Sequence, residues 1–159
     1  MGEIVWLASY PKSGNTWTRA FLTHYLVERP DEFDINHLEG GPISSARILF
    51  DLNVGVESSC LTAAEIDELR AEAFTQFARE SAGTCFIKTH EKWARSASGT
   101  EIFPREVTRS VVYLIRNPLD VAISASHHFS VSLQRSVHLL SRSTRSLSCL
   151  LYTSPSPRD

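Results

Sequence analysis

Apolar residues along the chain alternate between short runs of strand length and repeats at helix spacing. Residues 3–9 form an apolar run that predicts a buried strand. Apolar residues then recur on one face of a predicted helix that reaches Val27, namely Trp17, Phe21, Leu22, Tyr25 and Leu26. Residues 85–88 and 110–115 predict two more strands, both in central positions of a sheet. Because helices separate the strands, the pattern predicts an α/β fold with a central parallel sheet.

Two further helices are indicated by their amino-terminal caps. Thr62 and Glu65 form a T-x-x-E capping box before apolar residues at positions 66, 69, 73 and 77, which predicts a helix from Thr62 to about Glu80. Asn117 as N-cap, followed by Pro118, predicts a helix that continues toward His128. Residues 28–60 are rich in Gly, Pro, Asp and Asn, so we expect a long surface connection with one short helix around 44–52.

The carboxyl-terminal segment has a different character. Eleven serines fall between residues 124 and 159, and the apolar periodicity stops near Ser141. We therefore expect one domain over residues 1–140 and a disordered or non-native tail over 141–159. Residues 149–159 resemble the translation of a transposase adapter used in sequencing libraries, an expectation that the nucleotide record would test.

Length, composition and net charge limit the number of domains, the ligands and the cellular compartment that we expect. The 159 residues, 42% of them hydrophobic, suffice for one domain with a core. A formal net charge of −2 implies no general affinity for polyanions, so we expect no nucleic acid partner and only a local anion site. Three cysteines without a C-x-x-C pair favour a reducing compartment and argue against a zinc site. Without a leader or an apolar stretch of roughly 20 residues, the sequence predicts a cytoplasmic protein without a membrane span.

The most informative segment is Y-P-K-S-G-N-T-W, residues 10–17, between the first predicted strand and helix. This segment combines a glycine, small hydroxyl residues and a lysine at a helix N-terminus. Such a site binds one anion through free backbone amides, the positive end of the helix dipole and the charge of the lysine. The order differs from a Walker A sequence, because Lys12 precedes Gly14 by two residues. The segment therefore predicts a ligand with a phosphate or a similar oxyanion.

Two later segments contain further candidates. K-T-H, Lys88 to His90, follows a predicted strand, and a histidine with a pKa near 6.5 suits a base at neutral pH. Arg116 and Ser124 stand eight residues apart, and the arginine offers a rigid fork to a phosphate. The alternatives are that His90 is an ordinary polar residue and that Arg116 pairs with Asp120 to cap the helix.

The three segments, in this order, resemble those of the sulfotransferase family, which uses 3′-phosphoadenosine 5′-phosphosulfate as sulfuryl donor. The resemblance covers about residues 4–140 and implies a P-loop-like, three-layer fold. It implies that the donor's 5′-phosphate is bound by Ser13, Gly14, Asn15, Thr16 and Trp17, and its 3′-phosphate by Arg116 and Ser124. His90 would take the acceptor's proton, Lys12 would stabilise the leaving phosphate, and Lys88 would assist at the transferred group, without a metal. Two roles stay open for Trp17: it stacks on the adenine of the donor, or it packs in the apolar stripe of the helix.

The sequence also departs from the family. The later G-x-x-G-x-x-K type segment of the family is absent, so we expect a truncated chain, an incomplete fold and exposed core surface. A catalytically silent nucleotide-binding fragment and a P-loop small-molecule kinase are the alternatives. We expect residues 28–60 and 91–104 to shape the pocket for a small-molecule acceptor with a hydroxyl or amine. The acceptor's identity and the oligomeric state stay open.

Overall fold

The structure is a computed structural model that describes residues 2–26 and 34–141. Three strands form one parallel sheet in the order β2, β1, β3. They are β1 (Glu3–Ser9), β2 (Thr84–Thr89) and β3 (Thr108–Leu114), close to the predicted ranges. The predicted α/β fold with a parallel sheet is confirmed. The adapter-like segment 149–159, and all of the predicted tail after Ser141, lie outside the described residues.

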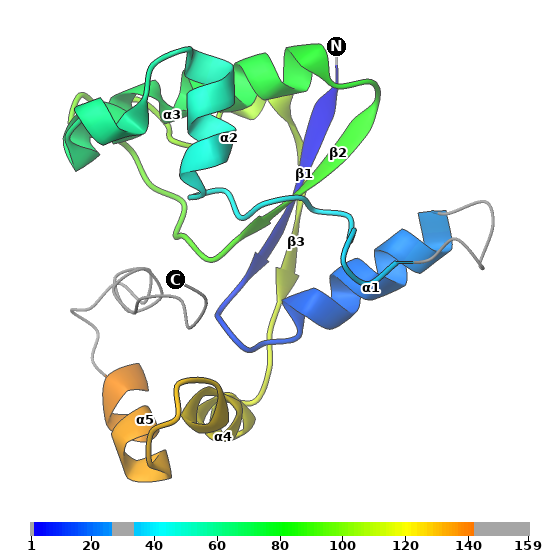
Figure 1. Ribbon diagram of the computed structural model, residues 1–159, viewed down its shortest axis with the longest axis vertical. Helices are drawn as coiled ribbons and strands as arrows, with labels where there is room; N and C mark the ends of the chain where they lie inside the picture. Colours follow the sequence, from blue (N-terminus) through cyan, green and yellow to red (C-terminus); the bar gives the residue numbers. More distant parts are fainter. Residues whose placement is uncertain (1, 27–33, 142–159) are drawn as a thin grey trace.

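Helices flank the sheet (Figure 1). On one face α2 (Arg47–Val54) packs against α3 (Ala63–Glu80), and α1 (Asn15–Leu26) extends on the other. The predicted capping box is present at the start of α3. The Thr62 hydroxyl accepts from the Glu65 amide, and the Glu65 carboxylate accepts from the Thr62 amide. These bonds satisfy amides that a helix start leaves without partners.

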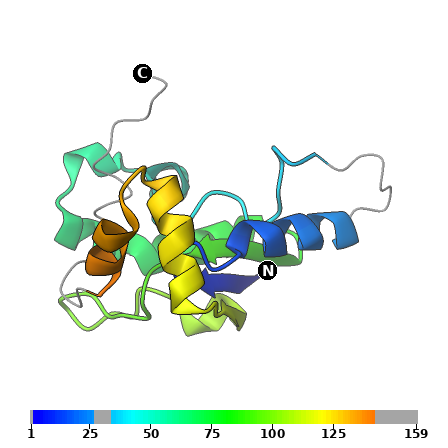
Figure 2. The same ribbon diagram turned by 90° about the horizontal axis from the view of Figure 1, so that it is seen from below.

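Two helices lie beyond the carboxyl ends of the strands, α4 (Pro118–His128) and α5 (Leu133–Leu140). Figure 2 looks at this end of the molecule, with α4 in front of the sheet. α4 begins as predicted, because Asn117 Oδ1 accepts from the Leu119 amide at 3.0 Å. Short 3₁₀ turns precede α3 and β3, namely η2 (Ser58–Cys60) and η3 (Arg105–Val107).

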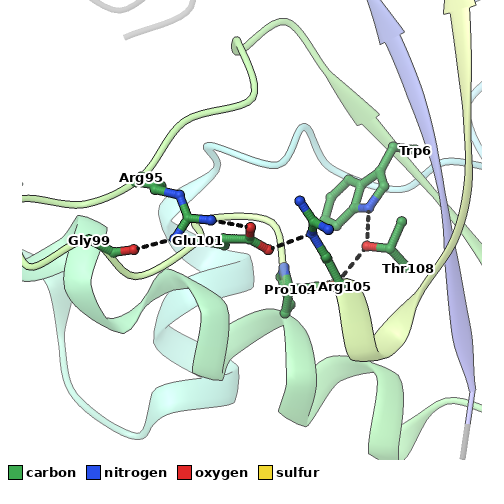
Figure 3. Close-up of polar contacts among 7 residues, drawn as sticks. All are labelled: Trp6, Arg95, Gly99, Glu101, Pro104, Arg105 and Thr108. Carbon is green, nitrogen blue, oxygen red and sulfur yellow. Dashed lines mark hydrogen bonds and ion pairs between the residues drawn. The ribbon is translucent and has the colours of Figure 1, made fainter.

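Aromatic rings fill the core between the sheet and α3. The indole of Trp6 on β1 lies edge-on to Phe74 and Phe103, with ring centroids 4.9 and 4.8 Å away. All three side chains are fully buried. Trp6 Nε1 donates to the Thr108 hydroxyl at 2.9 Å, and this hydroxyl donates to the Pro104 carbonyl at 2.7 Å (Figure 3). The polar atom of the buried indole is thus satisfied, which stabilises its place in the core.

Two helices contribute to this core differently from the sequence prediction. The expected surface connection includes α2, which buries Leu49 and Phe50. α3 buries Ala73, Phe74 and Ala78 most deeply, and the other members of the predicted stripe, at positions 66, 69 and 77, are half-buried. The deepest of these residues is Phe74, which meets the indole of Trp6, while Phe77 packs against the same core from a less buried position.

The sequence predicted that the second and third strands are central in the sheet, and this prediction is wrong for the sheet that the described residues form. β1 alone is central, and β2 and β3 form the two edges. The backbone of Lys88 on β2 is bonded to the carbonyl of Gly40 and the amide of Ser44, so the 40–44 segment lines that edge. β3 has no such neighbour among the described residues, and its apolar side chains Val111 and Val112 are exposed on opposite faces.

α1 also faces the opposite way from the prediction. Its apolar side chains Trp17, Phe21 and Tyr25 are 83%, 66% and 74% exposed. A polar row at i, i+4 spacing faces the protein instead, namely Asn15, Arg19 and Thr23. These polar side chains face inward because they form hydrogen bonds with main-chain groups. Arg19, for example, donates to three carbonyls of residues 38–41.

We expect Phe74→Ala to lower the free energy of unfolding by roughly 3–5 kcal/mol, because it leaves a cavity beside Trp6. Phe21→Ala is the matched control, since its ring is mostly exposed and its loss should cost about 0.5 kcal/mol or less. Urea titration followed by tryptophan fluorescence measures both. Equal losses for the two variants would contradict the assignment of the core.

Candidate functional site

The three segments singled out in the sequence meet at one edge of the sheet. In the parallel register Ala8 pairs with Thr89 and Ser9 pairs with Leu114. The loop that follows β1, the residue His90 after β2 and the turn after β3 therefore leave the sheet together. The carboxyl ends of parallel strands are where ligands bind in open α/β sheets.

The loop between β1 and α1 has an unusual backbone. Lys12 has a φ of 68° and Gly14 a φ of 101°, and left-handed residues in such a turn are typical of anion-binding nests. The left-handed conformation of Lys12 costs roughly 1–2 kcal/mol. Arg116 offsets part of this cost, because its Nη1 donates to the Lys12 carbonyl at 3.1 Å. The loop is closed by a bond from the Ser13 amide to the Tyr10 carbonyl.

Asn15 fixes the loop to the strand from which it emerges. Its side chain is buried, and Nδ2 donates to the Leu7 carbonyl at 2.8 Å and to Ser9 Oγ at 3.2 Å. The start of α1 is therefore held against the end of β1. The first amides of α1 have no acceptor within the helix and are available to a ligand.

A cavity of about 400 Å³ lies over this loop and is called the first cavity. It brings together nine of the ten residues selected from the sequence, which are Lys12, Gly14, Asn15, Thr16, Trp17, Lys88, His90, Arg116 and Ser124. The tenth, Ser13, lines a smaller hollow beside Tyr113 instead. The first cavity's lining includes three cationic side chains and no carboxylate. Such a lining fits a ligand with more than one negative charge.

His90 is held as a base by its hydrogen bond to the backbone. Its Nδ1 lies 2.7 Å from the Ser9 carbonyl oxygen, which can only accept. Nδ1 therefore bears the proton of the neutral ring, and Nε2 keeps a free lone pair. Burial lowers the pKa of His90 below its usual 6.5, and the nearby Lys88 lowers it further, against the effect of the Ser9 bond. The ring is thus neutral at pH 7.

Lys88 projects from β2 into the same cavity. Burial lowers the pKa of its ammonium group, and the positive charges of Arg19 and Lys12 lower it further. Lys88 therefore lies near other positive charges, and the lining of the cavity has no acid to balance them. An anionic ligand would relieve the repulsion, so the unliganded site is poised to bind one.

Sequence reasoning missed one polar residue of the first cavity, His128. It lines the cavity from the end of α4, and burial lowers its pKa, with further lowering by Lys12 and Lys88. The signal was available, since His128 follows Ser124 at i, i+4 spacing on the predicted helix and so shares its face. The apolar residues Ile43 and Phe129 also line this cavity.

Two alternatives left open by the sequence are now decided. Arg116 bonds to the Lys12 carbonyl, and it forms no ion pair with Asp120 within the described part of the chain. Trp17 is almost fully exposed and borders the first cavity, so it is not part of the described core. Both side chains are therefore available to a ligand.

A second cavity, of about 420 Å³, also has His90 in its wall. It lies against the sheet face of Trp6 and Ala8, whose register partners on β3 are Val111 and Tyr113. Lys88 pairs with the intervening residue of β1 and so points to the opposite face. The two cavities therefore reach His90 from opposite faces of the sheet.

The segment after His90 forms a wall of the second cavity. Glu91 is fixed by Arg70 of α3 at 2.6 Å and by the Ser44 hydroxyl at 2.8 Å. Residues 94–102 fold back as a hairpin in which Glu101 bridges two arginines, Arg95 and Arg105 (Figure 3). The expectation that residues 91–104 border a pocket agrees with this geometry. Of the described part of residues 28–60, only Ile43 reaches either cavity.

Neither a metal-binding group nor a transmembrane helix is found in residues 2–26 and 34–141. In those ranges no three His, Cys, Asp or Glu side chains cluster as metal ligands. No helix there is both long and apolar enough to cross a membrane.

Comparison with known proteins gives one match. The family model for the sulfotransferase domain matches residues 3–139, which is most of the chain. No individually curated protein matches the sequence. The matched range includes the loop after β1, the K-T-H segment and the turn after β3, so it contains every residue of both cavities.

We expect His90 to titrate below pH 6.5 when its ring is followed by NMR, because it is half-buried beside Lys88. Lys88→Met should raise the pKa of His90, since it removes a positive charge that opposes protonation. Lys92→Met is the control for charge loss nearby and should leave the titration unchanged. A His90 pKa above 6.5 in the native protein would contradict the assigned neutral base.

Proposed function

Because the chain belongs to the sulfotransferase domain family, we propose that it transfers a sulfuryl group from 3′-phosphoadenosine 5′-phosphosulfate to a hydroxyl or amine of a small molecule. The observation that supports this donor most directly is the lining of the first cavity. Lys12, Lys88 and Arg116 supply three cations there without any carboxylate, around a loop whose left-handed residues are typical of an anion-binding nest. The donor supplies an activated sulfate, joined to the 5′-phosphate through one bridging oxygen.

The two ends of the first cavity suit the two phosphate groups of this donor. The loop backbone from Gly14 onward and the first amides of α1 would bind the 5′-phosphate. Arg116 and Ser124, from the turn after β3 and from α4, would bind the 3′-phosphate. Trp17, exposed at the cavity's margin, offers its ring to the adenine.

His90 would act as general base in the transfer step. Its free Nε2 accepts the proton as the acceptor oxygen or nitrogen bonds to sulfur. The bond between sulfur and the bridging oxygen breaks, and the electron pair stays with the 5′-phosphate. Lys12 stabilises the charge that grows on that leaving group, and Lys88 stabilises the transferred oxygens.

Phosphoryl transfer from ATP is less compatible with this site. Kinases of the P-loop type hold magnesium through a hydroxyl after the loop lysine and an acidic residue. Lys12 precedes the glycine of this loop, and the first cavity has no Asp or Glu in its lining. A metabolite kinase is therefore not supported by the residues present.

The donor is tested by competition for the first cavity. We expect 3′-phosphoadenosine 5′-phosphate to bind at least roughly tenfold more tightly than ATP with magnesium, measured by calorimetry. Ser124→Ala should weaken this ligand by roughly tenfold while adenosine 5′-monophosphate, which lacks the 3′-phosphate, changes little. A preference for ATP with magnesium would overturn the proposed donor.

Turnover is tested with the donor and a panel of acceptors. We expect His90→Asn to lower the rate by about 10²–10⁴ and to leave nucleotide binding intact, because asparagine can keep the bond to Ser9 but lacks a base. Lys12→Ala should lower the rate as well. Donor binding without any product in the native chain would support a nucleotide-binding role and contradict the catalytic proposal.

A further inference from the structure

The carboxyl end of α4 borders the first cavity. His128, the last residue of this helix, and Phe129, its C-cap, both line the cavity. The carboxyl end of a helix is the negative pole of its dipole, which disfavours an anion nearby and favours a cation. A positive charge on His128 would therefore offset an unfavourable interaction between α4 and an anionic ligand.

Positive charges oppose a proton on His128 while the first cavity is empty. The other charged or titratable groups of the lining are Lys12 from the loop, Lys88 from β2, His90 after β2 and Arg116 after β3. None of them is a carboxylate, and α5, which packs on α4, contributes no residue to the lining. Burial lowers the pKa of His128, and the charges of Lys12 and Lys88 lower it further. Without a ligand, His128 is therefore mostly neutral at pH 7.

An anion in the first cavity reverses this balance. Its negative charge offsets that of Lys12 and Lys88, so the ring of His128 can gain a proton and donate a charge-assisted hydrogen bond to the ligand. His128 is exposed, and water still solvates its charge, whereas His90 is half-buried. A proton is therefore less costly on His128 than on His90, which stays available as a base.

We propose that His128 is a further anion-binding residue of the first cavity, and that it takes up a proton from solvent when the nucleotide binds. This inference rests on the proposed donor and adds a proton to its binding step. A histidine whose pKa is higher in the bound state strengthens binding at low pH, and this contribution is lost as the pH rises through the bound-state pKa. Through His128, the nucleotide should thus bind more tightly at pH 6 than at pH 8.

The neighbouring residue His127 provides a matched control. Both histidines lie in the last turn of α4, so the helix dipole acts on both rings. His127 is exposed as well, but it lines none of the cavities described above. His128→Gln and His127→Gln are therefore the same change at adjacent exposed positions, and only the first alters the lining of the first cavity.

The first measurement follows the histidine rings by NMR as the pH is changed, without ligand and with saturating 3′-phosphoadenosine 5′-phosphate. Spectra of the two variants assign the signals of His127 and His128. We expect the nucleotide to raise the pKa of His128, because its phosphates offset the charges of the lysines, and to leave the pKa of His127 unchanged. A pKa of His128 that does not rise on binding would overturn the proposal.

The second measurement compares the affinity for this nucleotide at pH 6 and pH 8 by calorimetry. The phosphates of the ligand also titrate in this range, but their effect cancels when the two variants are compared. We expect the gain in affinity from pH 8 to pH 6 to be roughly threefold larger in His127→Gln than in His128→Gln. Equal gains in the two variants would contradict a role of His128 in binding.

Inorganic pyrophosphate is used as a second ligand, which separates this inference from the proposed donor. If pyrophosphate raises the pKa of His128 but the nucleotide does not bind, the donor fails and the anion-binding role of His128 stands. If the nucleotide binds and His128 does not respond, the donor stands and the role of His128 fails. If neither ligand binds, both proposals fail.

Discussion

The parallel pairing of β1 with both of its neighbours is the constraint on which the rest of this structure depends. It brings three strand ends, distant in sequence, to one edge and places Ser9 beside the residues that follow β2. β1 is held in turn by the Trp6 indole, which is packed between Phe74 and Phe103 and bonded to Thr108. The aromatic core thus determines where the loop after β1 and His90 meet, and part of that core is also the floor of the second cavity.

Charge is concentrated locally in a chain that is nearly neutral overall. The formal net charge is −2, yet the first cavity gathers Lys12, Lys88 and Arg116 without an acid in its lining. Burial of Lys88 destabilises its charged form in the empty site, and repulsion from Arg19 and Lys12 adds to this. The site keeps its shape despite this unfavourable charge, because the surrounding backbone is fixed by the polar side chains of α1 and by the bond from Arg116 to the Lys12 carbonyl. Part of the binding energy of an anion would come from relief of that repulsion.

Much of the fold was predictable, because strand length, the capping box at Thr62 and the cap at Asn117 are local signals. Nine of the ten selected site residues line one cavity for the same reason: each belongs to a segment next to a strand end. Periodicity alone did not predict which face of α1 turns inward, since Asn15 is buried for its bonds to Leu7 and Ser9. Nor did it predict the edge position of β3, which depends on which strands pair. The second cavity was also beyond sequence reasoning, because its rings come from β1, β3 and the hairpin segment.

The partner of His90 connects the two cavities chemically. A carboxylate on Nδ1 would stabilise the imidazolium and raise the pKa of the ring, whereas the neutral Ser9 carbonyl does so only weakly. Burial and Lys88 therefore prevail, and His90 stays neutral but is a weaker base. A weaker base needs a more acidic proton to remove. The positive charge of Lys88, which lowers the pKa of His90, also stabilises negative charge that develops beside the ring, so these two effects on proton removal partly offset each other.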